Sequence, residues 1–507
     1  MPFCARDRDS AHLRNSREWT QMHGVRAMDG WQLIRRRYLV ASLLIFSFGL
    51  AGQVDAQKSY KQLKYPPLRA FQIPKPERVV LDNGLIVFLI EDHELPLVEA
   101  SLLIGAGSVY DPPEKVGLAA IATEVIRTGG STGRSGDEID ALLERTGTSV
   151  ELSAGLQTSS ASVSALKEHA GMAFEILTDI LRNPAFPQDK IELAKIGQRT
   201  AIARRNDNPM QIVNREFFKL IYGAQSPYAR HTEYATIDAI RREDLIAYHK
   251  AYFHPNNCIL GVWGDFNSAE MLQLIKQHFG TWPRGEVIKP QLPEVNYQWD
   301  YSVNFVRKPD LNQSYIMLGH LGGIRSNPDF FTWQVMNEIL GSAFTSRLFR
   351  VVRSRMGLAY SVFGMYGANY NYPGVFYVGC QTKLSSTVQA IRAMLDQVRS
   401  LREQEVSDEE LAQAKESFLN SFVFNFDSKR EIIDRLMTYE YYGYPADFLD
   451  RLRDAVSKVT KQDILRVARQ YLRPDQVRIL VVGNDQGLDQ PLSVLGPVNE
   501  IDITIPQ

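Results

Sequence analysis

The sequence has few cysteines, no excess of charge of either sign and no long apolar run beyond its N-terminal region. Its 3 cysteines rule out a disulfide-rich scaffold. Lys and Arg number 57 against 58 Asp and Glu, for a formal net charge of −1. Nucleic-acid-binding proteins usually carry a basic excess, so no nucleic-acid partner is predicted. After residue 56 no run reaches the roughly twenty apolar residues that a membrane span needs, so no transmembrane segment is predicted in the mature chain.

Neither the cysteines nor the histidines form a metal-binding motif. Cys258 and Cys380 lie in the apolar runs NNCILGVW and VFYVGCQT, which predicts two buried free thiols. A disulfide between them is the alternative. The histidines at 93, 231, 249 and 254 are scattered without ligand spacing. We interpret them as structural or surface residues.

The N-terminal region has the build of a secretory signal peptide. Three arginines precede an apolar run of about fifteen residues, which ends in small residues. We predict cleavage near Ala56–Gln57 and a mature protein that is periplasmic or secreted. Arg35 and Arg36 also fit a twin-arginine export signal loosely.

A long internal repeat determines the domain organisation. Residues 236–266 recur as 455–485, so that Tyr252 pairs with Tyr471, 219 positions later. A second match relates 186–195 to 406–415, 220 positions apart. The chain is therefore predicted to contain two copies of a unit of about 210 residues.

Each copy is expected to be α+β, with a mostly antiparallel sheet flanked by helices, because adjacent strand-like runs are followed by amphipathic helices. A segment rich in Pro and polar residues separates the copies, and this composition is typical of a linker. The predicted parts are an N-terminal extension with the signal peptide (1–56), a lead-in (57–76), a first domain (77–283), a linker (284–300) and a second domain (301–507).

Three segments in order carry a resemblance to a known family. They are VLDNGLIVFLIEDHELPLVEASLLIGAGSVYDPPEKVGLA, EIDALLERTG and NEILGSAFTSRLFRVVRSRMGLAYSVFG. Together they resemble the pitrilysin/insulinase family of zinc metallopeptidases, and in particular the zinc-free subunits of bacterial peptidases similar to the mitochondrial processing peptidase. The resemblance implies the pitrilysin-like two-domain fold. In that family, active members carry the zinc motif His-x-x-Glu-His on the helix that follows GLA, and a distant Glu is the third zinc ligand.

That zinc motif is missing from this chain. By the resemblance, the two histidines would fall at Ala120 and Glu124, the general-base glutamate at Thr123 and the third ligand near Thr200. A catalytic zinc needs three protein ligands, and alanine has no donor atom. Neither a zinc ion nor another cofactor is predicted in this chain. The helix that starts after Gly117 is expected to serve packing.

The second copy keeps the other part of the family's active site. In catalytic relatives an arginine and a tyrosine seven residues apart face the zinc, and here they match Arg353 and Tyr360. Arg353 is expected on the last turn of a helix that Met356 and Gly357 end, and Tyr360 at the start of the next strand. Both could donate to a peptide carbonyl as it becomes an oxyanion. Alternatively, Arg353 pairs with a surface acid and Tyr360 belongs to an amphipathic strand.

Two further stretches allow more than one interpretation. The aromatic cluster at 365–379 could line a peptide cleft, although alternating aromatic residues on strands more often pack in a core. The stretch GGSTGRSGDEID lacks the Gly-Lys-Ser/Thr of a phosphate-binding loop. It is expected to form a turn that caps a helix at Asp137.

The resemblance as a whole implies a chain that is inactive alone and acts in a heteromeric metalloendopeptidase. The expected partner is a zinc-bearing homologous peptidase subunit, and extended peptides are the expected substrates. Arg353 and Tyr360 would then act in the partner's active site. The rival hypothesis is a non-catalytic structural or core subunit of a larger assembly. A self-sufficient peptidase with relocated ligands is disfavoured.

Overall fold

The computed structural model describes residues 75–506 except residue 288. The predicted signal peptide, its cleavage site at Ala56–Gln57 and nearly all of the lead-in 57–76 lie outside the described residues. The described residues belong to one compact unit. No helix in the described part of the chain is both long enough and apolar enough to cross a membrane.

The first half is built on a six-stranded sheet with the order β1-β2-β6-β3-β5-β4. Only β2 and β6 run parallel, and the other neighbouring pairs are antiparallel. The strands are β1 (Glu77–Val80), β2 (Ile86–Glu91), β3 (Leu97–Ile104), β4 (Ser149–Ala154), β5 (Ser159–Leu166) and β6 (Cys258–Gly264). The helices are α2 (Leu118–Gly129), α3 (Gly136–Thr146), α4 (Ala170–Arg182), α5 (Gln188–Ala203), α6 (Pro209–Tyr222), α7 (Tyr234–Ala239), α8 (Arg242–Tyr252) and α9 (Ser268–Phe279).

The second half is built on another six-stranded sheet, with the order β10-β12-β8-β13-β7-β14. Its strands are β7 (Ser302–Arg307), β8 (Gln313–Leu321), β10 (Ala359–Tyr366), β12 (Val375–Lys383), β13 (Arg478–Gly483) and β14 (Val498–Glu500), and a small pair is formed by β9 (Gly323–Ile324) and β11 (Ala368–Asn369). The helices are α10 (Phe330–Asn337), the π-type turns η6 (Glu338–Ser342) and η7 (Phe349–Arg355), α11 (Thr387–Glu403), α12 (Asp408–Phe422), α13 (Lys429–Tyr442), α14 (Phe448–Lys458) and α15 (Lys461–Tyr471).

The two sheets share one topology, as the sequence repeat predicts. Strands β2, β6, β3, β5 and β4 of the first sheet correspond in order to β7, β13, β8, β12 and β10 of the second. In both sheets the first of these pairs is parallel, and the strands that follow are antiparallel. The predicted α+β class with mostly antiparallel sheets is therefore confirmed. Cys258 and Cys380 are buried free thiols, as expected.

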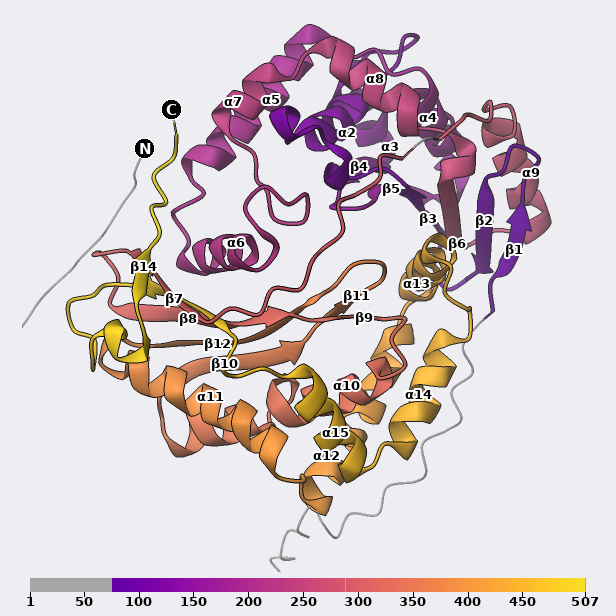
Figure 1. The fold of residues 1–507 in the computed structure, drawn as a ribbon. Coiled ribbons are helices and arrows are strands. Elements are labelled where there is room, and N and C mark those ends of the chain that lie inside the picture. Colours follow the sequence, from indigo (N-terminus) through magenta and orange to yellow (C-terminus); the bar gives the residue numbers. More distant parts are fainter. Residues whose placement is uncertain (1–74, 288, 507) are drawn as a thin grey trace, which may run out of the picture. The chain divides into compact units, whose positions relative to one another are not determined.

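The two halves exchange one helix each, a feature that the sequence did not reveal. Helix α6 of the first half packs on β8 and β13 of the second sheet, and α13 of the second half packs on β6 of the first (Figure 1). Both helices begin at equivalent places in the repeat, because Pro209 and Lys429 are 220 positions apart. Ile212, Val213 and Phe217 of α6 are fully buried in this contact. The exchange ties each copy's hydrophobic core to the other copy's chain.

Gly261 on β6 allows α13 to approach this closely. A Cβ atom at Gly261 would lie 2.0 Å from Ile433 Cγ2 and 2.7 Å from the sulfur of Met437. We therefore expect Gly261→Ala to lower the free energy of unfolding by about 1–3 kcal/mol, as overpacked cores do. Urea unfolding measures the change.

Gly197 provides the matched control. It lies on exposed α5, and a Cβ there would meet no heavy atom within 4 Å. Gly197→Ala is expected to raise the free energy of unfolding by about 0.5–1 kcal/mol, because alanine favours the helix. Equal stability of both variants would show that α13 does not pack tightly on β6.

Candidate functional site

Helix α2 begins at a buried carboxylate. Asp111 Oδ2 accepts a hydrogen bond from the Gly117 backbone N–H at 2.9 Å, and Oδ1 accepts one from Ala119 N–H at 3.0 Å. These N–H groups lie at a helix N-terminus, which favours negative charge. Burial nevertheless raises the pKa of Asp111 to about 6. Gly117 has a φ of 110°, a left-handed conformation that favours glycine. Asp111 and Gly117 together fix where α2 starts.

The positions that would carry the zinc motif fall on α2 and α5, and their side chains do not fit a metal. Thr123 is buried, and its hydroxyl donates to the carbonyls of Ala119 and Ala120, both at 3.0 Å. Thr200 lies exposed on α5 and donates to Ile196 O at 2.9 Å. Ala120 offers no donor atom at all. Two of the four side chains are thus hydroxyls engaged in their own helix.

Glu124 is the single carboxylate at these positions. It is half-buried, and burial raises its pKa above the ordinary value for glutamate. One carboxylate cannot hold zinc or activate its water. Across residues 75–506 apart from 288, no group of three or more His, Cys, Asp or Glu could hold a metal ion. No catalytic step through zinc can be assigned to this chain's own residues.

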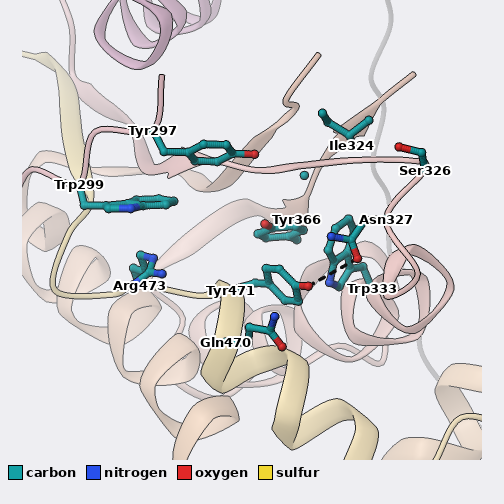
Figure 2. Close-up of a pocket in the computed structure, with 11 residues that line it drawn as sticks. Tyr297, Trp299, Ile324, Ser326, Asn327, Trp333, Tyr366, Gln470, Tyr471 and Arg473 are labelled. Carbon is teal, nitrogen blue, oxygen red and sulfur yellow. Dashed lines mark hydrogen bonds between the residues drawn. The ribbon is translucent and has the colours of Figure 1, made fainter. Parts of the chain in front are cut away.

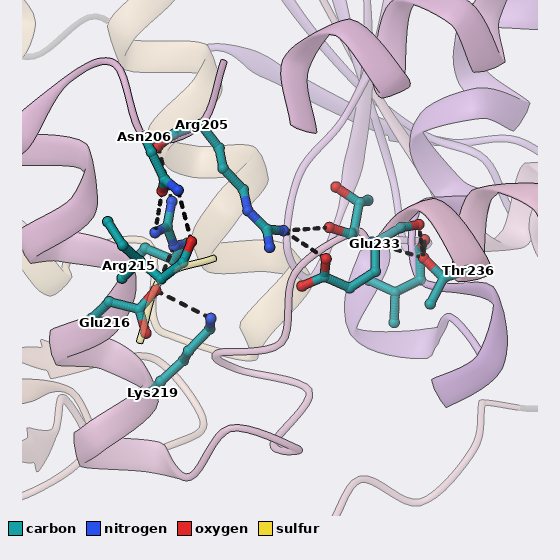
Figure 3. A network of polar contacts seen from close by, with 10 residues as sticks. Arg205, Asn206, Arg215, Glu216, Lys219, Glu233 and Thr236 are labelled. Carbon is teal, nitrogen blue, oxygen red and sulfur yellow. Dashed lines mark hydrogen bonds and ion pairs between the residues drawn. The ribbon is translucent and has the colours of Figure 1, made fainter. Parts of the chain in front are cut away.

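The connection between α5 and α6 is fixed by a network of ion pairs and hydrogen bonds (Figure 3). Arg205, directly after α5, donates to Glu233 at 2.8 Å. Arg215 on α6 donates to the carbonyl of Arg205 at 2.9 Å and to Asn206 Oδ1 at 2.8 Å, and it pairs with Glu216 at 2.6 Å. These contacts join the segment that follows α5 to α6 and to the residue before α7.

Asp111 is expected to matter for stability, with a defined pH dependence. Asp111→Ala removes the acceptor of two helix N–H groups and should lower the free energy of unfolding by about 1–3 kcal/mol. In the folded state its pKa is about 6, against 3.8 for the free side chain. Between these values the folded state binds more protons than the unfolded state, so wild-type stability gains as pH falls. Urea unfolding should show a larger deficit of the variant at pH 5 than at pH 7, and a deficit that shrinks toward pH 5 would refute this.

Arg353 and Tyr360 lie on consecutive elements of the second half, in the order that the sequence predicts. Arg353 is in the last turn of η7, Gly357 follows with a φ of 63°, and Tyr360 is the second residue of β10. The helical turn is of the π type and not α. Such turns are frequent at functional sites.

Tyr360 is presented by a β-bulge. Ala359 pairs with Thr382 and Ser361 with Gln381, so Tyr360 is the extra residue between them. Its side chain is 82% exposed, although Ala359 beside it is buried. Bulges are enriched next to active sites, where they redirect a side chain. Strand β10 is also the edge of its sheet.

The Arg353 guanidinium stacks on aromatic rings. It lies 4.4 Å from the centre of the Phe349 ring and 5.6 Å from that of Tyr360. Phe349 in turn contacts Phe344 edge to face at 5.1 Å, and Phe344 is 79% exposed. Arginine and tyrosine are therefore adjacent donors on one exposed aromatic surface.

Arg353 differs from Arg347 and Arg350 in having no carboxylate partner within the described residues. Arg347 makes a bidentate pair with Glu410 at 2.8 and 3.0 Å, and Arg350 reaches the same Glu410 at 3.0 Å. Within the described residues, no ion pair of Arg353 is formed. The alternative in which Arg353 pairs with a surface acid is therefore not what the structure shows.

The sequence did not predict the roles of several residues in this region. Phe344 and Phe349 belong to a quoted motif, but a phenylalanine pattern alone does not reveal exposure. Asp111 stands before Pro112, and an acid ahead of a helix could have indicated its capping role. The predicted cap at Asp137 was wrong, because Ser135 is the N-cap of α3 and forms a capping box with Glu138.

Comparison with protein families identifies both halves of the chain. Residues 86–234 match the family described as insulinase (peptidase family M16), and residues 239–418 match the one described as peptidase M16 inactive domain. YmxG of Bacillus subtilis (strain 168), named an uncharacterized zinc protease, is 24% identical over 407 residues, which are 80% of this chain and 98% of the relative. YmxG of Helicobacter pylori, named a non-peptidase homolog, is 22% identical over 457 residues, 89% of this chain and 99% of the relative.

Solved structures share the fold. A peptidase M16 inactive domain from Pseudomonas fluorescens superimposes with a TM-score of 0.74 at 22% identity, covering 82% of this chain and 100% of the other. A protease from Helicobacter pylori gives a TM-score of 0.72 at 19% identity, covering 81% of this chain and 100% of the other. At these identities the structures establish the fold alone.

Proposed function

Because the chain belongs to the insulinase (peptidase M16) family, we propose that it is the zinc-free subunit of an exported, heteromeric zinc metalloendopeptidase. Its partner is a zinc-bearing homologue, which supplies the metal, the general base and the water. This chain supplies Arg353 and Tyr360 to the partner's active site. The substrates are extended peptides.

The arrangement of Arg353 and Tyr360 carries this proposal. The Arg353 guanidinium lies over the rings of Phe349 and Tyr360 and forms no ion pair with a described residue, and the bulge exposes the adjacent Tyr360. An unpaired guanidinium and a free phenol can donate to a carbonyl oxygen that gains negative charge in the transition state. An arginine with a purely structural role is expected to pair with an acid, as Arg347 does with Glu410.

The edge of the second sheet supports the choice of substrate. Strand β10 is an edge strand and pairs with β12 within its sheet. Asn337 covers the far end of this edge, because it bonds the backbone N–H and C=O of Tyr366, so a peptide would add at the end that carries Tyr360. An extended peptide can add to such an edge as a further strand, with specificity set mainly by conformation. Tyr360 on the same strand would then stand beside the bound peptide backbone.

The rival function is that of a non-catalytic structural subunit. The name of the Helicobacter pylori relative, a non-peptidase homolog, favours it. Both functions agree with the missing zinc ligands on α2. They differ in whether Tyr360 affects peptide cleavage by the assembled complex.

Co-purification tests the proposed assembly. A C-terminally tagged chain, expressed in its own host, should be recovered from the periplasmic or extracellular fraction together with a homologue that carries His-x-x-Glu-His. N-terminal sequencing of the tagged chain should begin at or near Gln57. Recovery of the chain alone, or with its apolar N-terminal run retained, would contradict the exported two-subunit peptidase.

A further inference from the structure

A cavity in the second half, whose lining includes neither Arg353 nor Tyr360, is built like a ligand site. Its volume is about 540 Å³, within the range of small-molecule pockets. Figure 2 shows Tyr297 and Trp299 of the linker on one side and Trp333, Tyr366 and Tyr471 on the other. Five aromatic residues thus line a space large enough for the aromatic ring of a ligand.

Two residues that line the cavity each have a buried donor without an acceptor among the described residues. Trp333 is 0% exposed, and its indole Nε1–H has no hydrogen-bond partner. Arg473 Nε is also buried without a partner, and the guanidinium forms no ion pair with any described residue. Asp329, an acid on the segment leading to α10, is already bound by Arg466 and Tyr471. The guanidinium of Arg473 therefore carries a positive charge that no described carboxylate neutralises, and an anionic ligand could do so.

The cation of Arg473 is held in place. Its guanidinium lies 4.4 Å from the centre of the Trp299 ring. Its backbone N–H donates to His320 Nε2 at 3.1 Å, and the His320 Nδ1–H donates to Leu321 O at 2.7 Å. Burial lowers the pKa of His320 to about 4, so the ring is neutral at pH 7 and can accept this bond. The cavity therefore presents one fixed positive charge among aromatic rings.

We propose that this cavity binds a carboxylate carried on an aromatic or bulky apolar group. Arg473 neutralises the carboxylate, and the apolar group packs among the aromatic rings. Both the C-terminal residue of a peptide and a free aryl acid have this chemistry. The proposal does not depend on Arg353, Tyr360 or a partner subunit.

Calorimetric titration of the purified chain tests the proposal with N-acetyl-phenylalanine and its uncharged analogue, N-acetyl-phenylalaninamide. The acid is expected to bind at least about tenfold more tightly, because a charge-assisted bond to Arg473 is lost in the amide. Equal affinity of acid and amide, or no binding of either at millimolar concentration, would overturn the proposal.

Variants assign the binding to the cavity. Arg473→Gln should weaken binding of the acid about tenfold or more and leave binding of the amide unchanged, and Arg473→Lys should restore part of the loss. The matched control is Arg469→Gln, because Arg469 lies one turn earlier on α15 and donates to Arg402 O outside the cavity. Unchanged affinity in a folded Arg473→Gln protein would refute the site. Folding is checked by the melting temperature.

A third ligand separates the two sources of the carboxylate. The peptide Ala-Ala-Phe as the free acid should bind more tightly than N-acetyl-phenylalanine if the site takes peptide C-termini. Weaker binding of the peptide would assign the site to free aryl acids. Both results support the carboxylate site, and peptide binding that is insensitive to Arg473→Gln contradicts it.

Discussion

Tyr360→Phe is expected to lower kcat of the reconstituted two-subunit peptidase by about a hundredfold or more. The change removes one hydroxyl and preserves the ring, and loss of a single oxyanion donor typically costs about 2.7–4 kcal/mol. Tyr360 is 82% exposed and its neighbours on the bulge carry the packing, so the fold should be unaffected. Steady-state cleavage of a fluorogenic peptide measures kcat, and size-exclusion chromatography checks that the complex is intact.

Tyr301→Phe is the matched control for this variant. Tyr301 is also exposed, and its hydroxyl donates to Leu495 O near the opposite edge of the same sheet. It should leave kcat unchanged. If Tyr360→Phe also leaves kcat unchanged in an intact complex, the structural rival becomes the better account.

Arg353→Ala in the same complex should change both kcat and KM. The guanidinium can hold the peptide backbone before the reaction and stabilise the oxyanion during it. Its loss is therefore expected to weaken binding of both the ground state and the transition state. Arg355→Ala is the control, because Arg355 is exposed two residues later and makes no ion pair within the described chain. Zinc content and complex formation should be the same for both variants.

Restoring the three ligands is expected to create zinc binding that the wild-type chain is predicted to lack. The variant combines Ala120→His, Glu124→His and Thr200→Glu. Two histidines four residues apart share one helix face, and α5 packs on α2. Zinc content after dialysis should rise from none to about one ion per chain, measured by elemental analysis.

The control for this variant omits Ala120→His, so that a single histidine is left and position 120 has no donor atom. It should bind zinc far more weakly, because two of the three ligands cannot complete a site. Equal zinc content in the wild type, the control and the full variant would show that α2 and α5 do not preserve the frame of a zinc site.

The sequence was sufficient for the architecture because its signals are local or repeated. The match between residues 236–266 and 455–485 predicted two similar units, and both sheets follow one strand order. Apolar runs such as CILGVWG became fully buried strands. Arg353 and Tyr360 fell on the expected elements because glycine at 357 ends the helical turn.

Other features could not be predicted, because they depend on contacts between distant segments. Amphipathic α6 and α13 each have an apolar face, but periodicity does not say which sheet covers it. The packing of α13 on Gly261 depends on residues about 170 positions apart. The bulge at Tyr360 arises from the register of β10 with β12. Which arginine pairs with an acid depends on where Glu410 lies, and Glu410 contacts Arg347 and Arg350.

Zinc content and peptidase activity of the purified chain alone test the central claim most directly. Ala120, Thr123, Glu124 and Thr200 provide neither a ligand set nor a positioned base. The account therefore predicts no stoichiometric zinc by elemental analysis and no cleavage of unfolded peptides until the zinc-bearing homologue is added. About one zinc per chain, removed by a chelator together with peptide cleavage by the chain alone, would contradict it.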